Sequence, residues 1–507
     1  LVIVRVGPYI TAEVDFGGFP YWITKKNNIA IRRPNQVYYE LIDRYFDKMI
    51  PLLVPLQYNQ GGCIINFQIE DDTDVPLISF KDTHAYYSYL RDALVKRGIH
   101  SLINTLSWPE TISLTKAIIP NTWAALEYKV DFSTSTAIER LRKHIKTNNP
   151  FMVLEYYPAW MDLEGEKHAT LDSQVFAEGV DIILSKNGSI NFCMVFGGTN
   201  FGFFNGADWE LTYHAITTSY DYDAMVTECG DAHITKFKAV RDVIAKYTPL
   251  EPFPVPPPSS KGLYGSVIFN FSASLLKNLV PFDVVYDDLL MQFEYLNQSY
   301  GYILYTTQLH NFTGLTKPLL LPWMQDRAVI MLDGIIQGII GWTERVPITE
   351  INLHPLISNP NPKLDILVEN KGRCCGTKAG FGCSFKGMKG KPILGLKELG
   401  NWTMTKLPMN DILSDQSTTF TWLNTSTLSP TFYRSTFTIN NENPLHSFLC
   451  TDNWGHGFIM INGFNIGRFS ERGPQRTLYV PSHILRRGVN DILVLYWLLS
   501  TKLENPC

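Results

Sequence analysis

Four carboxylates occur within five residues at the end of an apolar, β-prone run, Cys63-Ile-Ile-Asn-Phe-Gln-Ile-Glu-Asp-Asp-Thr-Asp74. A buried strand that ends in acids presents them at its carboxyl end, where barrels of alternating strands and helices hold their chemistry. Two carboxyl groups that face each other there can cleave a glycosidic bond, one protonating the leaving oxygen and the other attacking or activating water. Taken alone, Glu70, Asp71, Asp72 and Asp74 fit a solvated acidic turn equally well; a calcium loop fits less well because its glycine-centred frame is absent.

A second acid follows a similar run, since Glu155 ends Phe151-Met-Val-Leu. Residues 1–247 alternate β-branched or apolar runs with segments of helical periodicity, which predicts parallel strands with helices between them. We expect strands near 1–6, 63–69, 99–106, 123–126, 151–155 and 190–196, and helices near 36–50, 83–97, 137–147, 173–186 and 232–247. Six strands are two fewer than a closed (β/α)8 (TIM) barrel has, so we expect this chain to lack the first two strand-helix units.

The chain beyond residue 247 has a different character. Residues 248–261 carry six prolines and predict a stiff, extended linker. Short alternating runs with Gly, Pro and Asn turns then predict two jelly-roll-like β-sandwich domains, at 262–410 and 411–507, and this pattern by itself indicates only a scaffold or a carbohydrate-binding module. Two segments, 329–338 and 458–468, share one design: a hydrophobic strand, an Asp-Gly or Asn-Gly turn and a second strand.

Composition narrows the partners and the compartment. The net charge is −4, from 44 basic and 48 acidic residues without long blocks of either sign, which argues against nucleic acid and anionic membranes. No apolar run approaches the roughly 18 residues of a membrane span. The histidines show no paired metal spacing, so we expect no metal site. An oligomer is compatible with the sequence.

Two further signals favour the secretory pathway, with a secreted, lysosomal or other acidic vesicular destination. Asn-x-Ser/Thr sequons, which are candidate glycosylation sites, cluster beyond the linker. They are Asn187, Asn270, Asn297, Asn311, Asn401 and Asn424. Among the eight cysteines, Cys374, Cys375 and Cys383 lack zinc-site spacing, so we expect disulfides there. No signal peptide precedes Leu1, so we expect targeting information to be missing from this N-terminus.

Five motifs in order give the chain a family resemblance. They are Gly7-Pro-Tyr-Ile-Thr-Ala-Glu-Val-Asp-Phe-Gly-Gly, Phe67-Gln-Ile-Glu, Gly197-Gly-Thr-Asn-Phe-Gly-Phe-Phe-Asn-Gly-Ala, Thr218-Ser-Tyr-Asp-Tyr-Asp-Ala and Ile461-Asn-Gly-Phe-Asn-Ile-Gly-Arg. Together they resemble glycoside hydrolase family 35, the acid β-galactosidases, and in particular the animal β-galactosidase-like proteins. The resemblance implies a retaining exo-β-galactosidase, with a catalytic barrel, two β-domains and no cofactor.

The resemblance also implies roles for individual residues. Glu155 stands where the family has its nucleophile. Asp72 stands at the acid/base position. Tyr9, Glu13, Asp71, Tyr157 and Tyr222 stand at or beside positions that contact the galactoside.

The sequence departs from the family at the acid/base motif. Where the family has Gln-Val-Glu-Asn-Glu-Tyr-Gly, this chain has Gln68-Ile-Glu-Asp-Asp-Thr-Asp. Asp72 therefore replaces the acid/base Glu, Asp71 replaces an Asn and Thr73 a Tyr, while Leu154 replaces a small polar residue before the nucleophile. An aspartate is one methylene shorter, and a misplacement of about 1 Å can cost on the order of a hundredfold in rate.

Two functions stay open at this point. One is a β-galactosidase that hydrolyses terminal β-galactosides of glycoconjugates, with activity weakened by Asp72. The other is an inactive pseudo-glycosidase that binds galactosides or proteins.

Overall fold

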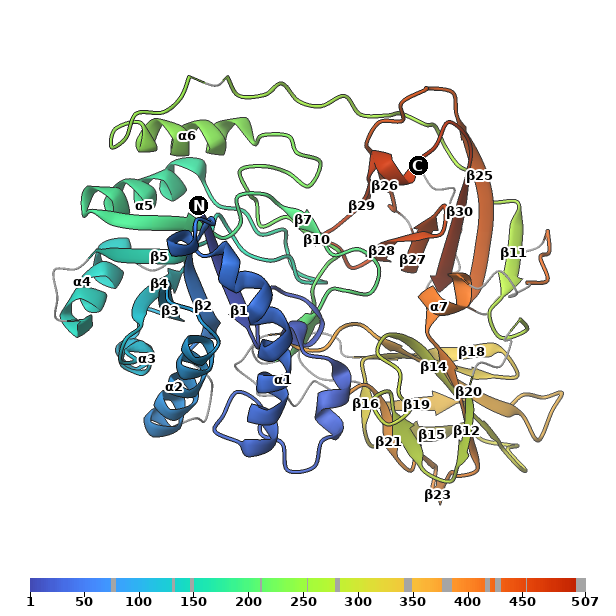
Figure 1. Ribbon diagram of the computed structural model, residues 1–507. Helices are drawn as coiled ribbons and strands as arrows, with labels where there is room; N and C mark the ends of the chain where they lie inside the picture. Colours follow the sequence, from blue (N-terminus) through green and yellow to red (C-terminus); the bar gives the residue numbers. More distant parts are fainter. Residues whose placement is uncertain are drawn as a thin grey trace.

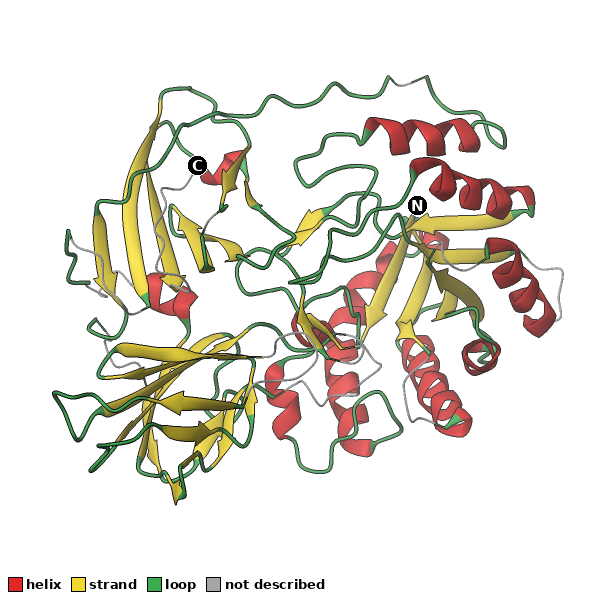
Figure 2. Cartoon of the chain, turned by 180° about the vertical axis from the view of Figure 1, so that it is seen from behind, coloured by secondary structure: helices red, strands yellow, loops and turns green. Residues whose placement is uncertain are grey.

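The computed structural model describes residues 1–73, 79–129, 133–145, 150–209, 212–252, 254–278, 283–341, 349–375, 385–414, 420–424, 430–452 and 454–497. Its N-terminal half is built on a curled parallel sheet of six strands in sequence order, with helices packed around it (Figures 1 and 2). The strands are β1 (Val2–Gly7), β2 (Ile64–Asp72), β3 (Leu102–Ser107), β4 (Trp123–Tyr128), β5 (Phe151–Tyr156) and β6 (Gly188–Phe192). The six strands predicted from the sequence are confirmed.

Helices follow the strands as the periodicity predicted. They are α1 (Gln36–Leu53), α2 (Phe80–Lys96), α3 (Thr111–Ala117), α4 (Thr134–Ile145), α5 (Ser173–Ser185) and α6 (Ile234–Ile244). Side-chain caps begin several of the predicted helices; for example, Asn35 accepts from the Tyr38 amide, and Asp172 accepts from the amides of Gln174 and Val175. The short α3 was not predicted.

Apolar residues pack the helices against the sheet in two clusters, one around α1 and α2 and one around α4, α5 and α6. The opposite face of the sheet carries a smaller apolar cluster, formed by Leu106, Ala125, Met152 and Leu154. Buried polar side chains, Asn66, Gln68 and Asn104, come from β2 and β3. Leu154, which departs from the family motif, is one of the apolar residues on this face.

After β6 the chain forms two small antiparallel pairs and then the linker. The pairs are β7 (Gly198–Thr199) with β10 (Ser219–Tyr220), and β8 (Ala207–Trp209) with β9 (Tyr213–Ala215). The described residues of the proline-rich linker run as an extended segment without regular secondary structure from α6 toward the C-terminal sheet (Figure 1). Asp231 holds its end, accepting hydrogen bonds from the Ser259 amide at 2.7 Å and from Lys261 Nζ at 2.6 Å.

The middle of the chain is a two-sheet β-domain. One sheet has the order β12 (Val284–Asp287), β24 (Trp402–Leu407), β14 (Gly301–Gln308), β20 (Lys363–Asn370), β17 (Arg327–Leu332) and β18 (Ile335–Gly341). The other has the order β19 (Glu350–Leu353), β15 (Lys317–Leu320), β22 (Ile393–Leu394) and β23 (Lys397–Glu398). One apolar cluster unites the two sheets. A third, small sheet joins β13 (Leu290–Gln292), β21 (Gly387–Gly390) and β16 (Met324–Gln325).

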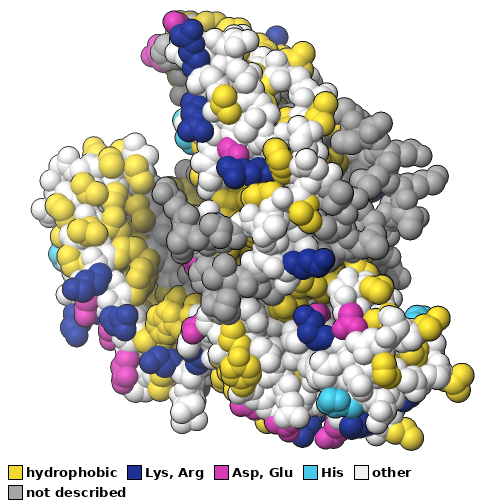
Figure 3. All heavy atoms as spheres, turned by 90° about the vertical axis from the view of Figure 1, so that its right-hand side faces the viewer, with side chains coloured by type: hydrophobic (Ala, Val, Ile, Leu, Met, Phe, Trp, Pro, Cys, Tyr) yellow, Lys and Arg dark blue, Asp and Glu magenta, His cyan; other side chains and the backbone are white. Residues whose placement is uncertain are grey.

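The last domain is centred on one antiparallel sheet. Its order is β11 (Phe271–Ser274), β25 (Thr431–Ile439), β30 (Gly488–Trp497), β27 (His456–Ile461) and β28 (Phe464–Ser470), with β26 (Ser447–Cys450) and β29 (Thr477–Val480) paired beside it. The helix α7 (Met409–Ser414) leads into it. The β17–β18 and β27–β28 hairpins confirm the two predicted Asp-Gly and Asn-Gly turns. On the face shown in Figure 3, acidic and basic side chains are intermixed.

The first strand after the linker differs from the predicted domain division. β11 pairs with β25, so residues 271–274 belong to the last sheet rather than to the domain predicted at 262–410. The chain therefore contributes one strand to the last domain, then forms the middle domain, and afterwards completes the last domain. Local pattern could not reveal this pairing, because about 160 residues separate the two strands.

Ion pairs join the N-terminal part of the chain to the middle β-domain. Arg373 donates to Asp15 at 2.8 Å and also pairs with the buried Glu294. Lys371 pairs with Glu164 at 2.5 Å. These contacts fix the loops that follow β1 and β5 against the middle β-domain, and thereby one side of the site described below.

Candidate active site

The carboxyl ends of β1, β2, β4 and β5 converge on a cavity of about 490 Å³. A cavity of this size fits a sugar-sized ligand. Its wall combines carboxylates, aromatic rings and two cationic side chains. It is lined by Arg5, Ile10, Thr11, Ala12, Glu13, Asp71, Asp72, Trp108, Glu127, Lys129, Glu155, Tyr157, Trp160, Met161, Cys193, Met194, Asp208, Tyr220 and Cys375. The structure thus brings Asp71, Asp72 and Glu155 together, as the sequence predicted.

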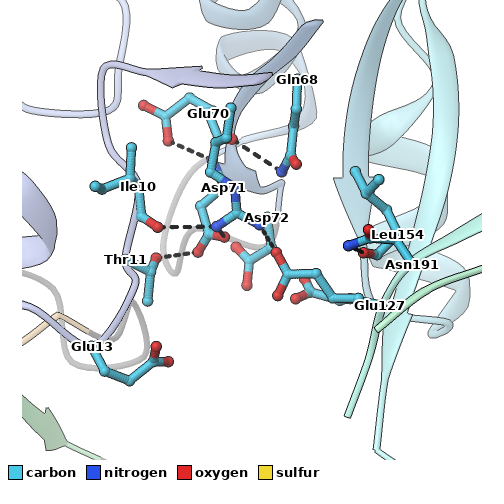
Figure 4. Close-up of polar contacts among 12 residues, drawn as sticks. Ile10, Thr11, Glu13, Gln68, Glu70, Asp71, Asp72, Glu127, Leu154 and Asn191 are labelled. Atoms are coloured by element: carbon cyan, nitrogen blue, oxygen red, sulfur yellow. Dashed lines mark hydrogen bonds and ion pairs between the residues drawn. The ribbon is translucent and has the colours of Figure 1, made fainter. Parts of the chain in front are cut away.

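Glu155 is held on both of its carboxylate oxygens. The Tyr157 hydroxyl donates to Oε2, and Arg5 Nη2 contacts Oε1. The backbone beside it is also fixed, because Asn191 Nδ2 of β6 donates to the Leu154 carbonyl at 2.9 Å (Figure 4). Glu155 is only 7% exposed. The hydroxyl and the guanidinium together orient the carboxylate in a sheltered site, as a nucleophile requires.

Asp72 is held through its backbone and its side chain. Arg32 Nη2 and the Tyr87 hydroxyl donate to its carbonyl at 2.8 and 2.7 Å. Trp108 Nε1 donates to the carboxylate Oδ2 at 3.1 Å. Arg32 Nη2 lies 4.0 Å from Oδ1. These contacts fix the position of the Asp72 carboxylate at the end of β2.

The neighbouring acids of β2 are buried rather than solvated, which excludes the acidic-turn interpretation for residues 70–72. Glu70 is fully buried and pairs with Arg32 Nε at 2.8 Å. The Asp71 carboxylate accepts hydrogen bonds from Arg5 Nη1 at 2.8 Å and from the Thr11 hydroxyl. Asp74 lies outside the described residues.

Arg5 links the ends of β2 and β5 through its contacts with Asp71 and Glu155. Its Nη1 also donates to the Ile10 carbonyl at 3.0 Å, so one guanidinium spans Asp71, Glu155 and the loop after β1. It compensates part of the charge that Asp71 adds where the family has an amide. Sequence reasoning missed Arg5, although an arginine just before the Gly7-Pro8 motif at a strand end was the available signal.

Of the residues expected to contact the sugar, Glu13, Asp71 and Tyr157 line the cavity. The Tyr220 hydroxyl donates to Glu13, and burial raises the pKa of Glu13 to about 7. Tyr9 and Tyr222, each 1% exposed, pack behind the wall instead. The Tyr9 ring lies 4.2 Å below the Arg32 guanidinium, and the Tyr222 ring stacks on Tyr157 at 6.1 Å.

A further carboxyl group in the cavity, Glu127, was not predicted. It lies at the end of β4, directly paired in register with Glu155. The Tyr157 hydroxyl, which contacts Glu155, lies 3.3 Å from Glu127 Oε2. The rule that found Glu155, an acid directly after an apolar strand, would also have found Glu127 after Trp123-Ala-Ala-Leu.

The cysteines and sequons are placed as follows. Cys374 is disulfide-bonded, Cys375 is a buried free thiol and Cys383 lies outside the described residues. The expected disulfide at Cys375 is therefore wrong.

All six sequon asparagines are exposed. No helix among the described residues has both the length and the apolarity to cross a membrane.

Comparison with known families gives one consistent result along the chain. A family profile described as "Glycosyl hydrolases family 35" matches residues 1–247. Profiles described as "Beta-galactosidase, first all-beta domain" and "Beta-galactosidase, galactose-binding domain" match residues 291–408 and 430–490. The mouse beta-galactosidase-1-like protein is 33% identical over 525 residues, which cover 98% of this chain and 76% of that protein.

The chain belongs to glycoside hydrolase family 35. The family resemblance inferred from the motifs is confirmed, and the chain is a glycoside hydrolase. Bovine beta-galactosidase is 33% identical and human beta-galactosidase 32%, each across 98% of this chain and covering 77% and 74% of those proteins. Among solved structures, a Bacteroides uniformis beta-glucuronidase has a TM-score of 0.31 at 10% identity, covering 95% of this chain and 56% of that one, a likeness too low to support any argument.

Proposed function

We propose that this family 35 member hydrolyses terminal β-galactosides with retention of configuration, using Glu155 as the nucleophile. The observation that carries the proposal is the pairing of Glu155 and Asp72 across one sheltered cavity, with Arg5 and the Tyr157 hydroxyl on the two oxygens of Glu155. The printed names of the relatives, beta-galactosidases of cattle and human, support galactose as the sugar.

The reaction takes two steps. A Glu155 oxygen attacks the anomeric carbon while the glycosidic oxygen leaves with a proton from a carboxylic acid, and a water molecule then releases the sugar from Glu155 with help from the same group as a base. The family resemblance assigns this acid/base position to Asp72. The cavity wall supplies sugar contacts through Glu13, Tyr157 and Trp160.

An activated substrate tests this proposal without depending on the acid. A 2,4-dinitrophenyl leaving group needs little protonation, so the wild-type protein should hydrolyse the β-galactoside and release β-galactose first, as followed by proton NMR. Glu155→Gln should abolish the reaction, while the surface variant Glu178→Gln on α5 should leave it unchanged. Release of α-galactose first, or hydrolysis that survives in Glu155→Gln, would overturn the assignment. An absence of hydrolysis across pH 4–7 would favour the pseudo-glycosidase.

We also propose that the protein travels through the secretory pathway and carries N-linked glycans. The support is the exposure of all six sequon asparagines, Asn187, Asn270, Asn297, Asn311, Asn401 and Asn424, together with the disulfide at Cys374. A reducing compartment would not keep that disulfide. Expression in a secreting eukaryotic cell should give a product that loses mass on treatment with peptide N-glycosidase; an unchanged mass would contradict the proposal.

A further inference from the structure

One cavity carboxyl group has no role in the mechanism above. Glu127 is 3% exposed, and it lies between the strand of Asp72 and that of Glu155 in the sheet order. Its Oε2 accepts from the Tyr157 hydroxyl at 3.3 Å. Its Oε1 is buried and has no hydrogen-bond partner among the described residues. Figure 4 shows Glu127 near Asp71 and Asp72.

A buried carboxylate oxygen without a donor is costly as an anion. The same atom is stable as the hydroxyl of a neutral carboxylic acid, which can donate its proton to a ligand in the cavity. The two oxygens of Asp72 are placed differently, since Trp108 Nε1 donates to one and Arg32 lies 4.0 Å from the other. The contacts therefore favour a neutral Glu127 beside an ionised Asp72.

The charges around Glu127 act in the same direction. Burial, reinforced by the negative charges of Asp72 and Asp71, raises the pKa of Glu127 well above its usual range. The Arg5 charge and the Tyr157 hydroxyl oppose this rise and are the smaller influences. The titratable and charged groups that face it from the surrounding elements are Arg5, Asp71, Asp72, Lys129, Glu155, Tyr157 and Cys193.

The reach of the two side chains also differs. Asp72 is one methylene shorter than the glutamate of the family motif, whereas Glu127 has the full glutamate length. Glu127 and Glu155 approach the same Tyr157 hydroxyl, which places the two carboxyl groups near each other, and retaining enzymes hold their pair at roughly 5–5.5 Å.

We propose that Glu127, rather than Asp72, is the acid that protonates the departing sugar oxygen. In the first step a Glu155 oxygen bonds to the anomeric carbon, the bond from that carbon to the glycosidic oxygen breaks, and the oxygen keeps the electron pair and takes the Glu127 proton. In the second step the Glu127 carboxylate takes a proton from water, whose oxygen displaces Glu155 from the anomeric carbon. Asp72 stays ionised and stabilises the positive charge that develops on the sugar ring. This inference rests on the function proposed above.

The test compares Glu127→Gln with Asp72→Asn over aryl β-galactosides of graded leaving-group acidity. Loss of a general acid costs typically 10²–10⁴-fold. Glu127→Gln should lose about that factor in kcat/KM on phenyl galactoside and less than about tenfold on the dinitrophenyl galactoside. Asp72→Asn should lose activity by a similar factor on both. Glu178→Gln serves as the matched surface control.

Azide supplies a second readout that a structural role would not change. When the acid/base residue is replaced by a small residue such as alanine, azide can enter the space and attack the glycosyl-enzyme in place of water. Glu127→Ala should therefore form β-galactosyl azide and turn over faster with azide, whereas Asp72→Ala should not. Should Glu127→Gln fail to fold by circular dichroism, Glu127→Asp takes its place, with a loss confined to the poor leaving groups.

Two outcomes overturn the inference. One is a larger leaving-group dependence in Asp72→Asn than in Glu127→Gln, and the other is azide rescue in the Asp72 variant alone. Either would return the acid role to Asp72 and leave the proposed function standing. Failure of the wild-type protein on the dinitrophenyl galactoside would instead refute the proposed function itself, because that substrate needs no acid.

Discussion

Arg32 is the buried cation that holds the end of β2, and Arg32→Met tests that role. Arg32 is 1% exposed, pairs with the fully buried Glu70 at 2.8 Å and donates to the Asp72 carbonyl at 2.8 Å. Methionine keeps much of the volume but leaves Glu70 without its cation. Breaking a buried pair in this way costs about 3–5 kcal/mol. We expect a loss of that size in the free energy of unfolding.

Urea denaturation, followed by aromatic fluorescence, measures the loss. Glu70→Gln in the Arg32→Met background should recover part of it, because the uncompensated buried charge is then gone. The control is Arg487→Met, whose partner Glu442 is 82% exposed; surface pairs of this kind are worth about 0–1 kcal/mol. A loss below about 1 kcal/mol for Arg32→Met, or no recovery in the double variant, would refute the reasoning.

Two further predictions concern the cavity wall. Burial raises the folded-state pKa of Glu13 to about 7, above the unfolded value of about 4.3, so the stability that its protonation provides is complete below about pH 4.3 and is lost as the pH rises to about 7. Urea denaturation at each pH measures the free energy of unfolding of Glu13→Gln and of the wild-type protein. The value for Glu13→Gln minus that for the wild type should rise by about 3 kcal/mol across that pH window. A difference that does not change with pH would contradict the raised pKa. Tyr157→Phe removes the hydroxyl that donates to Glu155. Because hydrogen bonds to charged groups contribute about 1.5–3 kcal/mol, kcat/KM on dinitrophenyl galactoside should fall roughly 10- to 150-fold. A change under threefold would exclude a role for the hydroxyl.

Sequence reasoning reached the elements that local pattern determines. The apolar runs that became β2 and β5, the helical periodicity of α1 and the Asn-Gly turn of β27–β28 each depend on a few neighbouring residues. Chain order then placed the acids of β2 and β5 at one edge of the sheet. The family motifs added the roles of Glu155 and Asp72.

The rest depended on contacts between distant residues. Arg5 acquires its role only because β1 lies beside β2, and the pairing of β11 with β25 joins segments that local periodicity treats separately. Tyr9 and Tyr222 were expected at the sugar and lie behind the wall, because a motif identifies a residue but not the direction of its side chain. Glu127 was within reach of the strand-end rule, but the burial and the neighbouring acids that raise its pKa depend on the fold.

The most direct test of the account is covalent labelling of Glu155. A 2-deoxy-2-fluoro-β-galactoside with a dinitrophenyl leaving group slows the release step more than the attack, so the intermediate accumulates. We predict one sugar per protein by intact mass, and a peptide map that places it on Glu155 in the wild-type protein, with none in Glu155→Gln. A label on Glu127 or Asp72, or no label at any pH from 4 to 7, would contradict the central claim that Glu155 is the nucleophile of a galactosidase.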